Sequence, residues 1–109
     1  GIIRGSVDQF DFSTQQDPTL KIPHMGWNQL EIKKVNCPIF KGINDLSDAY
    51  FCHSYYPNPK DKDIIASETG YGIKFASSIW KKNIYGVQFH PEKSQKVGLQ
   101  ILNNFINIK

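Results

Sequence analysis

The sequence predicts an α/β fold in which mainly antiparallel strands precede one amphipathic helix at the C-terminal end. Short strand-like segments fill most of the chain, and the hydrophobic residues adopt a helical period only after Ser94. At 109 residues the chain has room for one domain at most. Since a single helix leaves part of such a sheet uncovered, we expect the chain to belong to a larger α/β domain.

The first third of the chain is expected to form strands separated by turns. Residues 2–12 indicate a strand or a bent strand pair, and residues 15–19 indicate a loop. Polar and apolar residues alternate over 27–32, which predicts a strand, and residues 33–36 turn the chain.

The middle of the chain predicts a helical turn followed by more strands. Residues 37–43 form the turn, with a proline near its start and a glycine at its end. A strand over 50–56 is expected to stop at Pro57 and Pro59.

A hairpin and one further strand follow. The hairpin consists of residues 64–69 and 73–80 around a turn at 70–72. A second turn at 82–83 leads into a strand over 84–89.

The last segment is amphipathic. Ser94 is expected to be the N-cap of this helix. The apolar face holds Val97, Ile101, Leu102, Phe105 and Ile108. The opposite, polar face holds Lys96, Gln100, Asn103, Asn104 and Asn107.

Composition and charge exclude several classes of protein. The content of 39% hydrophobic and 21% charged residues is that of an ordinary globular domain. The formal net charge of +3 comes from scattered lysines and a single arginine, so we expect a solvated surface and no nucleic-acid partner. No apolar run approaches the roughly 18 residues of a membrane span, and no signal peptide is recognisable, so no membrane association is expected. Two cysteines are too few for a disulfide framework, which favours a reducing, cytoplasmic location.

The junction between the last strand and the helix holds the residues most suited to chemistry. Pro91 biases His90 toward an extended conformation, in which His90 and Glu92 project to the same side. A carboxylate beside an imidazole fixes its tautomer and makes it a general base. A hydrogen-bonded surface pair without a catalytic role is the alternative interpretation.

Neither cysteine has the surroundings of a nucleophile. Cys37 precedes a proline in a turn, and Cys52 lies in an aromatic strand, where we expect it to be packed in the core. His53 is expected to be a packed, hydrogen-bonded histidine, and His24 could lie in the core or at an interface. The three histidines and two cysteines show no paired metal motif, so no metal site and no cofactor are expected.

Three segments resemble the triad-type, class I glutamine amidotransferases. They are Pro-His-Met-Gly-Trp-Asn at 23–28, Tyr-Phe-Cys-His-Ser-Tyr at 50–55, and Tyr-Gly-Val-Gln-Phe-His-Pro-Glu-Lys-Ser at 85–94. The Phe-His-Pro-Glu block is typical of the whole class. The His-Met-Gly-Trp-Asn block at 24–28 and the Lys-Ser that follows Glu92 are similar to the glutaminase subunits of imidazole glycerol phosphate synthases. The resemblance implies the C-terminal, strand-rich half of a flavodoxin-like (Rossmann-like) amidotransferase domain.

The resemblance also implies roles for individual residues. His90 matches the catalytic base and Glu92 the acid that orients it, while Ser54 and Tyr55 match the stretch that holds the glutamine substrate. Five further residues match positions facing a (β/α)8-barrel cyclase, in a heterodimer: Met25, Trp27, Asn28, Tyr50 and Lys93. In that family ammonia released from glutamine passes to the cyclase, which forms imidazole glycerol phosphate for histidine biosynthesis.

One departure from the family pattern concerns the nucleophile. The family's catalytic cysteine sits in a Gly-x-Cys-x-Gly elbow upstream of the segment that matches Gly1, and Cys37 and Cys52 occupy other positions. We therefore expect residues 1–109 to be the C-terminal portion of one amidotransferase domain, unable to release ammonia alone. Three alternatives remain open: a paralogue that supplies ammonia for surface-sugar amidination, a non-catalytic binding module, and a self-contained hydrolase using Cys52.

Overall fold

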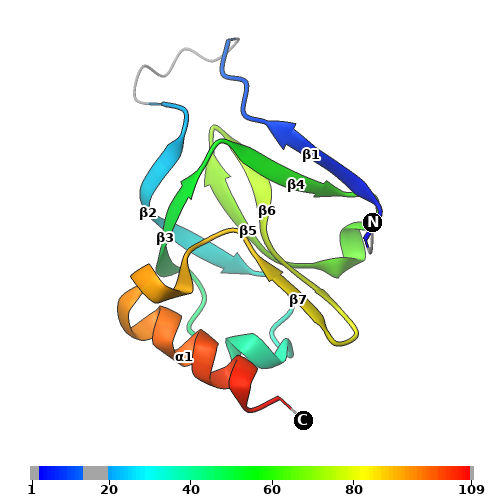
Figure 1. Ribbon diagram of the computed structural model, residues 1–109, viewed down its shortest axis with the longest axis vertical. Coiled ribbons are helices and arrows are strands. Elements are labelled where there is room, and N and C mark those ends of the chain that lie inside the picture. The colour runs from blue at the N-terminus through cyan, green and yellow to red at the C-terminus, as the bar shows by residue number, and fades with distance from the viewer. Residues whose placement is uncertain (1–2, 14–19, 109) are drawn as a thin grey trace.

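The computed structural model describes residues 3–13 and 20–108, and the loop expected at 15–19 lies outside them. Five strands form an antiparallel sheet in the order β3-β2-β5-β6-β7, and β1 pairs with β4 in a separate ribbon (Figure 1). The strands are β1 (Gly5–Gln9), β2 (His24–Ile32), β3 (Ser47–His53), β4 (Tyr55–Pro59), β5 (Ile65–Tyr71), β6 (Ile73–Lys81) and β7 (Ile84–Val87). The helices are α1 (Gln95–Ile106) and the short 3-10 helices η1 (Pro38–Phe40), η2 (Lys62–Ile64) and η3 (Pro91–Lys93). The predicted fold class, antiparallel strands followed by one C-terminal helix, is confirmed.

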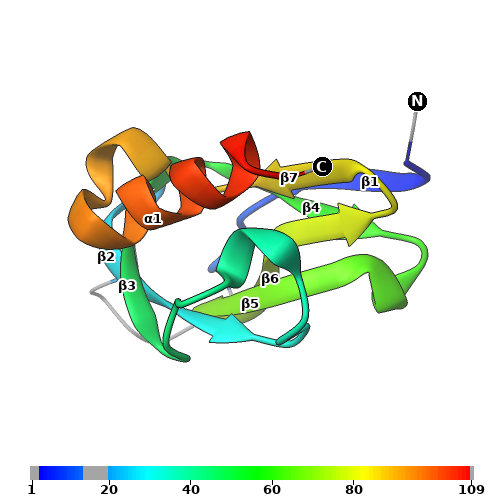
Figure 2. The ribbon, with the colours of Figure 1, turned by 90° about the horizontal axis from the view of Figure 1, so that it is seen from below.

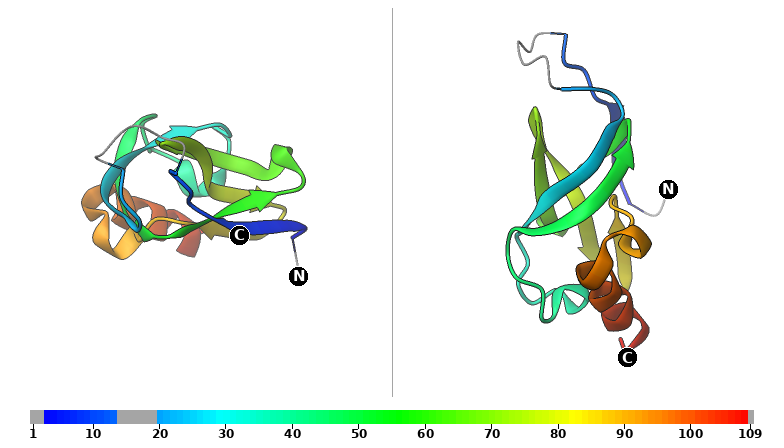
Figure 3. Two further views of the ribbon diagram at one scale, coloured as in Figure 1. Left: turned by 90° about the horizontal axis from the view of Figure 1, so that it is seen from above. Right: turned by 90° about the vertical axis from the view of Figure 1, so that its left-hand side faces the viewer.

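The helix and the two-stranded ribbon occupy opposite ends of the molecule. Figure 2 shows α1 at the left and β1 with β4 toward the right, and Figure 1 shows η1 beside α1. The five-stranded sheet is strongly twisted, as Figure 3 shows. No helix in the described residues has the length and apolar character that a membrane crossing requires.

The core lies between the five-stranded sheet and the elements that pack on it, which are η1, α1 and the β1–β4 ribbon. Aromatic side chains dominate it, and Phe10, just beyond β1, packs its ring against those of Phe75 and Tyr56. The buried members are Phe10, Leu30, Cys37, Ile39, Phe40, Ala49, Phe51, Ala66, Phe75, Phe89 and Ile101. Large aromatic rings supply much of the apolar area that a chain of this size can bury.

The predicted hairpin and the turn after it are confirmed. Gly72 joins β5 to β6 with φ +73°, and a Cβ there would lie 2.7 Å from Cε1 of Phe12, so the position requires glycine. The strand expected over 84–89 is shorter, because β7 ends at Val87. Beyond it the chain crosses the molecule, since the His90 amide donates to the Tyr50 carbonyl of β3 at 2.8 Å.

The strand expected over 50–56 is wrong in its extent. The chain bends at Ser54, so that β3 ends at His53 and β4 begins at Tyr55, and Pro57 and Pro59 lie inside β4. Prolines are tolerated there because β4 has β1 as its hydrogen-bonded neighbour in the described structure and is otherwise an edge strand. β2 also begins earlier than expected, at His24.

The face of α1 that packs on the core is narrower than predicted. Ile101 is buried, but Leu102 and Phe105 remain 37% and 53% exposed. Asn104, expected on the polar face, donates from its amide to the carbonyls of Ile39 and Lys41 at 2.9 and 2.8 Å. The helix lies across η1 at the end of the sheet, so part of its apolar stripe passes beyond the core.

Candidate active site

The pair expected at the strand–helix junction is present. Nδ1 of His90 lies 3.3 Å from the carboxylate of Glu92, and their side chains are 40% and 56% exposed. His90 has extended backbone angles (φ −96°, ψ 100°), and Pro91 begins η3 directly after it. Because His90 is extended before Pro91, the side chains of His90 and Glu92 lie on the same side of the chain, as the sequence predicts.

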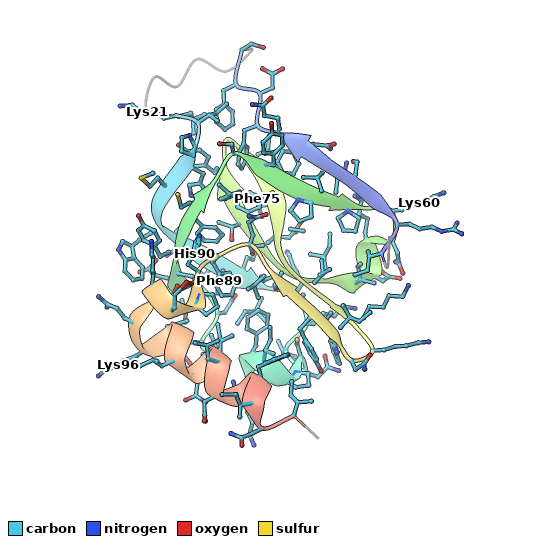
Figure 4. The ribbon with its side chains drawn as sticks, in the orientation of Figure 1. Lys21, Lys60, Phe75, Phe89, His90 and Lys96 are labelled. Carbon is cyan, nitrogen blue, oxygen red and sulfur yellow. The ribbon has the colours of Figure 1, made fainter. Side chains whose placement is uncertain are left out.

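The backbone around this pair is bound tightly to β3. The His90 amide donates to the Tyr50 carbonyl at 2.8 Å. The Tyr50 amide donates to Oγ of Ser94 at 2.9 Å, and this hydroxyl donates to the His90 carbonyl at 2.7 Å. Figure 4 shows His90 and Phe89 at this junction, between the sheet and the start of α1. Ser94 occupies the predicted N-cap position, but its side chain caps no amide of the helix.

Four of the five residues that match partner-facing positions lie together. Trp27 and Tyr50 face each other across β2 and β3 with ring centroids 5.8 Å apart, and Nζ of Lys93 lies 5.7 Å from the Tyr50 centroid. Met25 and Trp27 are two residues apart in β2, so their side chains lie on the same side of the strand, and both are largely exposed. We call these four residues, Met25, Trp27, Tyr50 and Lys93, the Trp27 face.

Asn28 lies apart from this face. Its amide nitrogen contacts Nε2 of His24 at 3.2 Å and donates to the Gly70 carbonyl at 2.8 Å. Successive residues of a strand point to opposite sides, so Asn28 projects away from Trp27.

Ser54 and Tyr55 occupy the bend between β3 and β4. The Ser54 carbonyl accepts from the Phe10 amide at 3.1 Å, and the Tyr55 side chain is 51% exposed. Ser54 lies four residues beyond Tyr50, about 13 Å along an extended strand. The structure therefore places these two residues just beyond the C-terminal end of β3, whereas His90 is anchored to the middle of that strand.

A second histidine pair lies inside the molecule. Nδ1 of His24 is 2.9 Å from Nε2 of His53, and both residues are buried. Because the amide nitrogen of Asn28 can only donate, Nε2 of His24 accepts and Nδ1 of His24 donates to Nε2 of His53. Nδ1 of His53 then donates to the Tyr55 carbonyl at 2.8 Å. The hydrogen bonds of the pair thus run in one direction with both rings neutral.

Burial keeps both rings of this pair neutral. It lowers the pKa of His24 to about 4, and the neighbouring His53 adds to the effect. Burial also lowers the pKa of His53, with an opposing hydrogen bond to Tyr55 and a further decrease caused by the nearby His90. The expectation of a packed, hydrogen-bonded His53 is confirmed, and His24 lies in the core. The pairing of the two rings was not expected from sequence, because it depends on β2 beginning at His24.

The two cysteines occupy different environments. Cys37 is buried, and this burial raises the pKa of its thiol. The expectation that Cys52 is packed in the core is wrong, because its side chain is exposed. The alternation of β3 turns Phe51 and His53 to the core and Cys52 to the other side.

Metal-ligating side chains and lysines are two further kinds of candidate binding group on the surface. Among residues 3–13 and 20–108, no three His, Cys, Asp or Glu side chains are grouped as metal ligands. Lys21, Lys60 and Lys96 lie at separate edges of the molecule and point outward (Figure 4). This arrangement is that of solvated surface lysines.

Comparison with known proteins identifies the class of protein. Residues 7–108 match the family model described as glutamine amidotransferase class-I. The chain therefore belongs to the class I glutamine amidotransferase family.

Three relatives of this chain carry the same subunit name. The imidazole glycerol phosphate synthase subunit HisH of Geobacter sulfurreducens is 54% identical over 109 residues, covering 99% of this chain and 52% of the relative. The subunit HisH of Syntrophotalea carbinolica is 48% identical over 105 residues, which is 95% of this chain and 50% of the relative. That of Methanocaldococcus jannaschii is 48% identical over 108 residues, 99% of this chain and 51% of the relative. The chain thus spans about half the length of these curated relatives.

Proposed function

We propose that this chain is the C-terminal portion of a glutaminase that supplies ammonia to a cyclase making imidazole glycerol phosphate in histidine biosynthesis. The identity of about half to relatives that carry the subunit name supports the proposal. The observation that carries it is the contact between Nδ1 of His90 and the Glu92 carboxylate at 3.3 Å. We place the protein in the cytoplasm, in keeping with two free cysteines.

The geometry of the pair supports a general base. With its Nδ1 proton directed at Glu92, a neutral His90 ring has Nε2 as its basic atom. We propose that Nε2 takes the thiol proton of a cysteine in the part of the domain that this chain does not include. The thiolate attacks the amide carbon of glutamine, the carbon–nitrogen bond breaks, and Nε2 returns the proton to the leaving ammonia. Water then hydrolyses the thioester and releases glutamate.

Substrate and partner are assigned to the two other groups of residues. Ser54 and Tyr55 at the β3–β4 bend bind glutamine. The exposed rings and the ammonium group of the Trp27 face bind the cyclase, a (β/α)8 barrel, in a heterodimer; aromatic residues are enriched in protein interfaces. Asn28 supports that face from behind through its bonds to His24 and Gly70.

The test is glutaminase turnover by the full-length protein with its cyclase. His90→Ala is expected to lower kcat by about 10²- to 10⁴-fold, the usual contribution of a general base. Glu92→Ala is expected to lower it less, because the carboxylate orients the ring and transfers no proton. Glu31→Ala, which removes a half-buried, ion-paired carboxylate elsewhere on the sheet, is the control. Near-wild-type turnover in both His90→Ala and Glu92→Ala overturns the assignment.

A further inference from the structure

Ser94 makes an unusual use of its hydroxyl. A serine at this position of a helix normally accepts a hydrogen bond from an amide of the first turn, which is worth about 1 kcal/mol. Here the hydroxyl leaves the helix uncapped. It accepts from the Tyr50 amide at 2.9 Å and donates to the His90 carbonyl at 2.7 Å.

These bonds hold the backbone of His90 on both sides. The His90 amide donates directly to the Tyr50 carbonyl, and the His90 carbonyl reaches the Tyr50 amide through Ser94. The backbone N–H and C=O of Tyr50 therefore fix the backbone C=O and N–H of His90. A backbone bound in this way fixes the direction of the Cα–Cβ bond from which the imidazole projects.

Packing prevents Ser94 from adopting another arrangement. The residue is 1% exposed. A Cβ at Gly98 would lie 1.8 Å from the Pro91 carbonyl oxygen and 2.9 Å from Cβ of Ser94, so η3 rests directly on the first turn of α1. The next residue, Gln95, has φ +53°, a conformation that a side chain makes costly and that the surrounding contacts must maintain.

We infer that Ser94 is a positioning residue for the base His90, acting through the two hydrogen bonds that join His90 to Tyr50. This inference rests on the proposed function. Ser94 contacts neither substrate nor the reacting atoms in this role. Its effect is to hold the imidazole where the thiol proton and the leaving ammonia are within reach.

The first experiment compares Ser94→Ala with Ser77→Ala in the full-length protein with its cyclase. Ser77 is the matched control, because its buried hydroxyl also makes a hydrogen bond, 2.8 Å from Oγ of Ser67, within the sheet. Ser94→Ala is expected to lower kcat by about 10- to 100-fold, the size of effect that a misplacement of about 1 Å produces. The KM for glutamine is expected to stay within about twofold of the wild-type value, and Ser77→Ala is expected to leave both constants unchanged. Equal kcat values in the two variants, or a raised KM with an unchanged kcat, overturn the inference.

A double-mutant cycle separates positioning from a general loss of structure. If Ser94 acts through His90, then Ser94→Ala combined with His90→Ala is as slow as His90→Ala alone. Additive losses in the combined variant contradict the inference. If Ser94→Ala does not fold, Ser94→Cys replaces it, because a thiol fills the site but donates weakly. Near-wild-type turnover in His90→Ala removes the proposed function itself, whereas a slow His90→Ala with a normal Ser94→Ala removes only the role of Ser94.

Discussion

Two side-chain pairs that contain histidine, His24 with His53 and His90 with Glu92, both depend on β3 but lie in opposite environments. His53 belongs to β3 and meets His24 in the core, where aromatic rings surround both, whereas His90 stands outside β3 with its side chain 40% exposed beside Glu92. The buried pair has its ring nitrogens engaged by Asn28, by each other and by the Tyr55 carbonyl. The exposed pair has one ring nitrogen directed at a carboxylate.

The difference teaches which property separates a structural histidine from a candidate base. An imidazole can exchange a proton with a reactant only if one nitrogen is accessible and the charged form is tolerated. Burial disfavours the charged form of His24 and His53, and their lowered pKa values express this. His90 keeps access to solvent while its backbone is fixed, so a rigid support and a reactive side chain coexist in one residue.

The largest expected effect on stability comes from breaking the buried His24–His53 pair. His53→Leu leaves the donor of His24 and the Tyr55 carbonyl without their partner, which is expected to lower the free energy of unfolding by about 1–3 kcal/mol. Urea denaturation measures the change. In the variant His24→Leu/His53→Leu the loss should be smaller than the sum of the two single losses, since no half of the pair remains. A loss below about 0.5 kcal/mol in His53→Leu contradicts a structural role for the pair.

Acid is expected to weaken the same pair without any substitution. The pKa of His24 is lowered to about 4 from 6.5, so between these values the unfolded chain binds a proton that the folded chain does not. The contribution of His24 to the free energy of unfolding is therefore fully present above about pH 6.5 and is lost as the pH decreases toward 4. The contribution of His24 is at most about 1.4 kcal/mol per pH unit, and His53 adds to it in the same direction.

Denaturation at pH 7, 6 and 5 tests this prediction. Over that range the carboxyl groups of Glu31 and Asp11, whose pKa values are lowered by hydrogen bonds, remain ionised and contribute little. The variant His24→Leu/His53→Leu should show a shallower dependence on pH than the wild type. An equal dependence in the two proteins rules out the buried pair as its source.

The smallest expected effect on stability belongs to the exposed pair. His90→Ala and Glu92→Ala should each change the free energy of unfolding by less than about 0.5 kcal/mol, because exposed ion pairs contribute little. The same urea measurement, made beside His53→Leu, gives the contrast directly. If His90→Ala destabilises the protein as much as His53→Leu does, the exposed pair is part of the structural framework.

Residues close together in sequence were the most predictable. His90 and Glu92 meet because a proline between them restricts the backbone, and the 73–80 strand and its turn follow from alternation and glycine. Neighbours of this kind need no knowledge of the tertiary structure. The predictions that were wrong required it: the bend at Ser54, the exposure of Cys52, and the exposed half of the α1 stripe.

The sequence by itself determined the family, the order of strands before one helix, and the local geometry of the His90–Glu92 pair, since each depends on short motifs and backbone restriction. Tertiary structure alone decided that His24 meets His53 and that Ser94 joins His90 to Tyr50. His24 and His53 are 29 positions apart in the chain, and Tyr50 and Ser94 are 44 positions apart. The formation of these contacts depends on the register of β2 with β3 and on the crossing of the chain from β7 to β3, which no local pattern specifies.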